Sequence, residues 1–431
     1  MENNIFRHKL SNELEIMAIE KPNTSLFLIE MIVKVGSSVL FQNKDEIECA
    51  HFLEHFNARF TSTKYPNYKE NIHKFDFNGI TYNASTSDEE TRYWLYGHKD
   101  NKELILDILL NSYADFKIDE ASLEQEREAI INELYMSKSN YDKNNYNNLT
   151  KIYKYSYDID DRINSTKTMT IKKLKNFRDK YYCSNNTKIL IIGDISHENI
   201  FNYITLYFEN NKVKKHDIII PEYNVPLIDN NIFYNKKIDS ENTSIFITFA
   251  LDINIFNVNY YTTIYISNIL RQRLHRYLRD DAGKVYGVGV NYFAQHFNKL
   301  NFLIISTSIR EKNNIISVYK IIFDQINRMI LGDISESRYL KAQNGYRVDF
   351  LKQDLNNDFG SLMNQYVNEY LYDKKLLSKN DELNNMMSVT LNDIKKLSKE
   401  ILNPKNIIIN NYGKYNLIKE IKVLLSQNYI I

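Results

Sequence analysis

The chain reads His51-Phe52-Leu53-Glu54-His55, and the order of these residues suits a hydrolytic metal site. On a helix, the two histidines lie one turn apart, so their imidazoles leave one face about 5–6 Å apart, a separation that one metal ion can bridge. Glu54 lies beside them on the same stripe of the helix. It directly precedes the second histidine, whereas the commoner zinc-protease helix carries its glutamate directly after the first. The pentapeptide therefore indicates a zinc site, and the alternative interpretation is a buried helix with paired polar side chains.

A second acidic stretch offers candidates for a further ligand, which a zinc site with three protein ligands and one water needs. Residues Glu126 to Glu133 read Glu-Arg-Glu-Ala-Ile-Ile-Asn-Glu in a segment that looks helical, with Ser122 and Gln125 spaced as a capping box. The two end glutamates are seven residues apart, so they lie two turns apart on one helix face. By itself, this stretch is typical of a solvated acidic helix.

Taken together, the two stretches resemble the inverzincin metallopeptidases, the family of pitrilysin, insulysin and mitochondrial processing peptidase, in its short two-domain type. The resemblance covers nearly the whole chain, and Glu133 matches the glutamate that ends the family's E-R-x-x-I-x-x-E run. It implies one Zn²⁺ per chain, bound by His51, His55 and Glu133. It also implies that Glu126 supports the ligands without binding metal, and that Glu54 is the catalytic general base.

Two further stretches resemble the substrate-binding parts of that family. Residues 79–87 match its G-x-x-x-N-A-x-T-S strand, so Asn83 and Ala84 are expected to contact a peptide that adds to the edge of a sheet. Arg279 and Tyr286, seven residues apart, match an Arg and Tyr pair that holds the peptide backbone or the developing oxyanion. Without the family match, the first stretch is a polar strand end and the second is a turn entering a strand.

The sequence is also doubled. Asn-Thr-Ser-Leu-Phe from Asn23 recurs 219 residues later as Asn-Thr-Ser-Ile-Phe from Asn242, each before an alternating apolar segment suited to a strand. An apolar run closes each half, at residues 185–193 and 403–409. The same offset places Leu270 and Leu274 opposite the two histidines, and Arg273 opposite Glu54. We therefore expect the second half to have lost the metal site.

These observations divide the chain into three parts. Residues 1–212 are predicted to form the zinc-binding domain, and residues 230–431 a homologous domain without metal that carries the Arg and Tyr pair. Residues 213–229, which hold Pro221 and Pro226, are predicted to be a linker. The resemblance implies an α+β fold with two homologous α/β sandwich domains, each a sheet packed with helices, that form half of a clamshell.

Composition narrows the partners and the compartment. The formal net charge is +1, without a basic tract, so neither nucleic acid nor an acidic membrane surface is favoured. No apolar run approaches the roughly 20 residues that a membrane helix needs. The only two cysteines, Cys49 and Cys183, form no disulfide framework, which agrees with a reducing compartment. We therefore expect a soluble cytoplasmic protein.

The expected function is a zinc-dependent metalloendopeptidase that hydrolyses peptides or unfolded polypeptides inside a chamber. Such chains are expected to pair as a homodimer, in which Arg279 and Tyr286 of one protomer face the zinc of the other. A heterodimer with a related chain, or a catalytically silent structural or regulatory subunit, are the alternatives. Two residues depart from the family pattern: Glu48, where relatives usually place a glycine, and Phe56, where a methionine is common.

Overall fold

A computed structural model describes residues 4–211, 213–219, 230–253, 257–294, 301–356, 363–364, 366–367, 369, 377, 379–402 and 407–428. The chain divides into two compact units. The first comprises Met1–Glu222 together with Asp358–Leu376, and the second comprises Tyr223–Asn357 together with Leu377–Ile431. Most of the predicted linker, including both of its prolines, lies outside the described residues.

The first unit is built on a six-stranded sheet of order β1-β2-β6-β3-β5-β4. Strand β6 pairs in parallel with β2, and the other neighbours are antiparallel. The central strands are nearly continuous runs of β-branched and apolar residues, as expected for strands covered on both faces. The strands are β1 (Asn4–Lys9), β2 (Glu15–Glu20), β3 (Leu26–Val33), β4 (Thr81–Thr86), β5 (Thr91–His98) and β6 (Thr187–Gly193).

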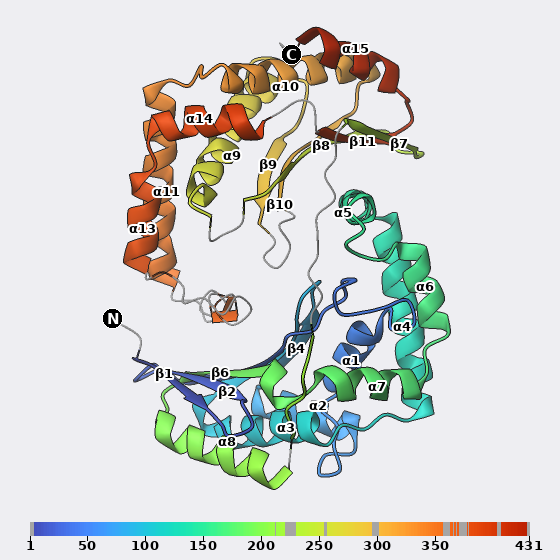
Figure 1. The fold of residues 1–431 in the computed structure, drawn as a ribbon, viewed down its shortest axis with the longest axis vertical. Coiled ribbons are helices and arrows are strands. Elements are labelled where there is room, and N and C mark those ends of the chain that lie inside the picture. The colour runs from blue at the N-terminus through green and yellow to red at the C-terminus, as the bar shows by residue number, and fades with distance from the viewer. Residues whose placement is uncertain are drawn as a thin grey trace. The chain divides into compact units, whose positions relative to one another are not determined.

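Helices cover one face of this sheet. Helix α3 packs on β3 and β5, and α8 packs on β2 and on α3 (Figure 1). The helices of the unit are α1 (Cys49–Asn57), α2 (Tyr68–Asn78), α3 (Lys102–Ala114), α4 (Glu120–Ser139), α5 (Tyr141–Ile152), α6 (Ile159–Lys167), α7 (Ile171–Tyr181) and α8 (His197–Asn211). The described helices include none that is both long and apolar enough to span a bilayer.

The opposite face of the sheet is covered by residues from far along the chain. Met363 and Tyr366 are each 6% exposed, and they pack on side chains of β2, β3 and β6 that point away from α3 and α8. The Asn364 side chain accepts a hydrogen bond of 2.9 Å from Arg92, and Glu369 forms an ion pair with Arg7. The first unit therefore includes a returning segment that the division at residues 213–229 did not anticipate.

The second unit repeats the sheet of the first. Its order is β7-β11-β8-β10-β9, with β11 parallel to β7 and antiparallel to β8. The repeat pairs β7 with β2, β11 with β6, β8 with β3, β10 with β5 and β9 with β4, so among the strands of the described residues only β1 has no counterpart. The strands are β7 (Ile232–Lys237), β8 (Thr243–Leu251), β9 (Val288–Phe293), β10 (Asn301–Ile309) and β11 (Ile407–Gly413).

Helices also pack on the second sheet, so the predicted fold class of two sheet-and-helix sandwiches is confirmed. They are α9 (Tyr260–His275), α10 (Lys312–Ile330), α11 (Glu336–Asn356), α13 (Lys379–Ser388), α14 (Leu391–Ile401) and α15 (Ile418–Asn428). In α9, Leu270 and Leu274 are fully buried and Arg273 is 3% exposed. The positions opposite the two histidines therefore belong to the core of this unit.

The predicted start of the acidic helix was wrong. Helix α4 begins at Glu120, ahead of the predicted capping box, and its N-cap is Asp119, whose side chain accepts a hydrogen bond from the Ser122 backbone N–H. An aspartate cap satisfies one of the free N–H groups of the first turn and suits the positive end of the helix dipole, so the helix starts earlier.

Candidate metal centre

Helix α1 places the inverted motif on the partly exposed side of a short, well-packed helix. Its apolar residues face α7 and the strands β4 and β5, and they are fully or nearly fully buried. These residues are Cys49, Ala50, Phe52, Leu53 and Phe56. Three polar side chains remain on the other side, where each is partly buried, and they are His51, Glu54 and His55.

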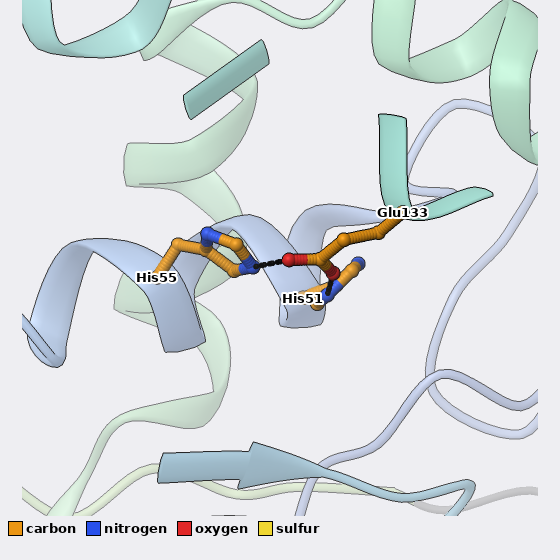
Figure 2. A group of neighbouring side chains, drawn as sticks. All are labelled: His51, His55 and Glu133. Carbon is orange, nitrogen blue, oxygen red and sulfur yellow. Dashed lines mark ion pairs between the residues drawn. The ribbon is translucent and has the colours of Figure 1, made fainter. Parts of the chain in front are cut away.

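Glu133 of α4 meets both histidines. Its Oε2 lies 3.4 Å from Nε2 of His51, and its Oε1 lies 3.7 Å from Nε2 of His55 (Figure 2). The two imidazole rings lie 4.8 Å apart, centroid to centroid, at 80° to one another. One nitrogen of each histidine and one oxygen of Glu133 all lie within 4.8 Å of one another. The structure thus brings together the three side chains that the sequence nominated as ligands.

This donor set fits a zinc ion. Zinc bonds of about 2.0–2.2 Å to nitrogen and oxygen in a tetrahedral site place two ligand atoms roughly 3.3 Å apart. Each Nε2 lies near that distance from an oxygen of Glu133, at 3.4 Å from Oε2 for His51 and at 3.7 Å from Oε1 for His55. Two imidazoles and one carboxylate also leave a fourth position open, as in catalytic rather than structural zinc sites.

A glutamate and an arginine support His55 from behind. Nδ1 of His55 lies 2.9 Å from Oε2 of Glu126, whose Oε1 is 3.2 Å from Nε of Arg59. A carboxylate accepts hydrogen bonds, so Nδ1 of His55 carries a proton and donates it to Glu126, and Nε2 faces Glu133. Glu126 therefore lies behind His55 and outside the group of three.

His51 has a matching pair that sequence reasoning missed. Its Nδ1 lies 2.9 Å from Oε2 of Glu48, and Oε1 of Glu48 accepts a hydrogen bond from Nε of Arg162 in α6. Glu48 was noted in the sequence only as a departure from glycine. The signal that could have identified it is its position three residues before His51, which is one helical turn.

The carboxylates shift the pKa values of the metal-free site. Burial lowers the pKa of both histidines, but hydrogen bonds to glutamates outweigh it and raise the pKa of His51 to about 9 and that of His55 to about 10. Hydrogen bonds from the two histidines hold the pKa of Glu133 well below its usual range. For Glu48, burial raises the pKa, but the Arg162 charge and the bond to His51 outweigh it and lower it to about 2.

These shifts predict how the stability of zinc-free protein depends on pH. Because the folded-state pKa values of His51 and His55 lie above the unfolded value of about 6.5, their contribution is complete below about pH 6.5 and is lost as pH rises through 9 and 10. We expect the free energy of unfolding of chelator-treated protein to fall by about 2–4 kcal/mol between pH 6.5 and 10, allowing for the exposed Glu133. Urea unfolding at both pH values measures this.

The control is the double variant His51→Gln/His55→Gln, in which the difference between the two pH values should shrink. A double variant that loses as much stability as the wild type over this range would show that other groups cause the loss.

Glu54 lies on α1 between the two histidines and outside the ligand group. Burial and hydrogen bonds have the largest effects on the pKa of His55, and burial has the largest effect on that of Tyr93. The negative charge of Glu54 contributes a smaller rise to both pKa values. The Tyr93 hydroxyl lies 2.6 Å from that of Tyr182 and accepts a hydrogen bond of 3.1 Å from Asn57. Glu54 therefore lies on the helix that bears two of the candidate ligands, and its charge acts on His55 and on a hydrogen-bonded tyrosine pair.

Asn83 and Ala84 lie on the outermost strand of the first sheet. Strand β4 pairs with β5, and within the described part of the chain no strand covers its other side. Its side chains alternate between exposed and partly buried, and the strand packs against α1. The Asn83 side chain accepts a hydrogen bond from the Ala84 N–H. An extended peptide can pair with such an edge through main-chain hydrogen bonds.

Arg279 and Tyr286 lie close together in the second unit. The Arg279 guanidinium stands over the Tyr286 ring, 5.3 Å from its centroid, and also contacts His275 at 3.2 Å. Tyr286 is 90% exposed, so its hydroxyl is free to meet a partner outside this unit. Arg279 belongs to a π-helical segment, Arg276–Asp280, that directly follows α9. Such segments occur frequently at functional sites.

The two units repeat one arrangement of strands, and the inverted motif occurs in the first copy alone. The family model described as "Insulinase (Peptidase family M16)" matches residues 15–161, and that described as "Peptidase M16 inactive domain" matches residues 168–346. The chain therefore belongs to the insulinase family, peptidase family M16. The resemblance to the inverzincin metallopeptidases, inferred from residues 51–55 and 126–133, is confirmed.

Relatives agree with this assignment. An uncharacterized zinc protease of Rickettsia felis is 26% identical over 359 residues, covering 81% of this chain and 84% of that protein. The beta subunit of mitochondrial-processing peptidase of Saccharomyces cerevisiae is 29% identical over 205 residues, covering 46% of this chain and 43% of the subunit. The crystal structure of a peptidase M16 inactive domain from Pseudomonas fluorescens has a TM-score of 0.81 at 15% identity, covering 96% of this chain and 98% of that one, which shows the shared fold alone.

Proposed function

We propose that this chain is a zinc-dependent metalloendopeptidase that hydrolyses peptides or unfolded polypeptides. The observation that carries the proposal is the meeting of His51 and His55 with Glu133, from helices far apart in sequence, at distances suited to one zinc ion. Membership of a peptidase family supports it, as do relatives named zinc proteases.

The ligand set and Glu54 divide the chemistry between them. Zinc held by His51, His55 and Glu133 would supply a Lewis acid for the peptide carbonyl and make water acidic enough to attack near neutral pH. As the water oxygen bonds to the carbonyl carbon, the Glu54 carboxylate takes the proton that the water loses. It then gives that proton to the leaving nitrogen as the carbon–nitrogen bond breaks. Water is consumed, and a new carboxyl and a new amine are released.

The exposed edge of β4 is the proposed site for the substrate backbone. An extended segment that pairs with Asn83 and Ala84 lies along a strand that packs against α1, the helix that bears both histidines. Main-chain pairing gives affinity with little dependence on side-chain identity. This mode of binding favours unfolded polypeptides, because a folded protein has few free extended segments to offer.

The proposed assembly is a homodimer, with a heterodimer as the alternative. Arg279 and Tyr286 of one protomer would then hold substrate at the zinc site of the other. The exposed position of Tyr286 supports a role outside its own unit, and one relative is named as a subunit. We propose the cytoplasm as the compartment, which agrees with two buried, unpaired cysteines.

The proposal is tested by peptide cleavage and metal content measured on the same purified protein. We expect about one zinc ion per chain and cleavage of a mixture of unfolded peptides. A chelator should abolish both the bound zinc and the cleavage, and added zinc should restore them. The matched control is Glu128→Gln, which changes an exposed glutamate of α4 outside the ligand group and should leave both unchanged.

The outcomes separate the alternatives. Protein that binds no zinc contradicts the proposal. Protein that binds zinc but cleaves nothing supports a silent structural or regulatory subunit, which the match of residues 168–346 to an inactive-domain model also makes a candidate. Cleavage that begins only after a related chain is added identifies a heterodimer.

A further inference from the structure

Glu48 occupies a position that is unfavourable for a glutamate in two ways. Its backbone has φ 68° and ψ 0°, the left-handed region, where a side chain with Cβ crowds the backbone and glycine is favoured. Its side chain is 1% exposed, so the carboxylate has lost its hydration. A glycine, which has no Cβ to crowd the backbone and no charge to bury, would avoid both costs.

Capping of the helix does not account for this residue. Glu48 is the N-cap of α1, but its side chain makes no capping hydrogen bond. Both carboxylate oxygens point elsewhere: Oε2 to Nδ1 of His51 at 2.9 Å, and Oε1 to Nε of Arg162. Strained residues persist where surrounding contacts hold them, and they cluster at functional sites. Here those contacts lead directly to a candidate ligand.

The bond to Glu48 fixes which ring nitrogen of His51 faces the ligand group. An ionised carboxylate only accepts hydrogen bonds, so Nδ1 of His51 donates to Glu48, and Nε2 is the nitrogen whose lone pair would bind a metal ion once its own proton is released. That Nε2 lies 3.4 Å from Glu133, inside the ligand group. Arg162 holds the other oxygen of Glu48 and so keeps the carboxylate from rotating away from the ring.

We propose that Glu48 is a positioning residue that orients His51 and presents its Nε2 to the metal ion. This inference rests on the proposed zinc site. Glu126 and Arg59 hold His55 in the same way, so each histidine has its own glutamate and arginine pair. The chain thus keeps a strained, buried glutamate at this position because it orients a ligand that would otherwise be free to rotate.

The test is the zinc dissociation constant of two variants, measured by competition with a chromogenic chelator. Glu48→Gly suits the left-handed backbone and removes the carboxylate, so it should fold and bind zinc about 10–100-fold more weakly. Glu48→Gln keeps the side-chain size but has one acceptor oxygen for two donors, so its loss should be smaller. Glu46→Gln is the control, since Glu46 contacts Lys180 and the Asn43 backbone and should not affect zinc binding.

A purely structural role would change the melting temperature of Glu48→Gly and leave zinc affinity as in the wild type, and that result overturns the inference. Weakened zinc binding in both Glu48 variants with normal circular dichroism supports it. If the wild type binds zinc, the variants bind it more weakly and no form cleaves peptide, the positioning role stands while the proposed function fails. A wild type that binds no zinc overturns both.

Discussion

The variant Glu54→Gln is expected to cleave peptide about 10²–10⁴-fold more slowly than the wild type while binding zinc equally well. Glutamine keeps the size of the side chain, but its amide cannot take a proton from water at neutral pH. Glu54 lies outside the group formed by His51, His55 and Glu133, so the ligand set is unchanged. The loss should appear in kcat with little change in KM, because proton transfer belongs to the reaction and not to substrate binding.

The measurement is steady-state cleavage of one defined peptide, with zinc quantified per chain in both forms. Glu128→Gln serves as the charge-matched control, because it removes one negative charge from the exposed side of α4. Equal rates for Glu54→Gln and the wild type would exclude Glu54 as the base. Loss of zinc together with activity would show instead that Glu54 holds the site together.

The fold could be predicted from the sequence where the signal is local and repeated. The apolar runs that form β3 and β6 recur in β8 and β11, and both pairs are central strands of their sheets. The order of strands around these pairs is also repeated. Internal repetition is informative because similar segments in the two halves predict the same structural unit twice. The start of α4 was misplaced because the spacing of Ser122 and Gln125 matches a capping box, whereas Asp119 caps the helix three residues earlier.

The returning segment could not be predicted, because nothing in its own sequence indicates its partners. Met363 and Tyr366 are ordinary apolar side chains, and their neighbours Met17, Ile19 and Leu28 lie more than 300 residues away in the chain. Apolar residues on a sheet face predict that another segment packs on that face, but they do not predict which segment it is. Only tertiary structure identifies that partner.

The candidate site shows the same limit. His51, His55 and Glu133 were nominated from motif spacing, and the structure places their ligand atoms together. Glu48 was treated as a mere departure, because its role depends on a left-handed backbone and on Arg162, which is 114 residues away. A family motif identifies only the residues that it contains, so it did not identify Glu48, whose role depends on these three-dimensional contacts.

The variant Glu133→Gln is expected to weaken zinc binding by more than the about 10–100-fold that follows loss of an orienting partner, because it removes a charged ligand itself. Zinc at 100 times its dissociation constant should stabilise the wild type by about 2.7 kcal/mol. This stabilisation raises the melting temperature of the wild type, and the same zinc concentration should raise that of the variant hardly at all. In zinc-free protein at pH 6.5 the variant should also be less stable, because both histidines lose a hydrogen-bonded carboxylate.

The wild type and Glu133→Gln should approach one another in zinc-free stability as pH rises through 9 and 10, the range in which His51 and His55 lose their protons. Glu128→Gln should follow the wild type in both zinc-free stability and zinc response. A variant Glu133→Gln that gains as much from zinc as the wild type would place the third ligand elsewhere. Glu133 is thus tested in two roles, as the partner of protonated histidines without zinc and as a ligand with zinc. A variant that simply folds poorly would be less stable at every pH, so it would not approach the wild type as pH rises.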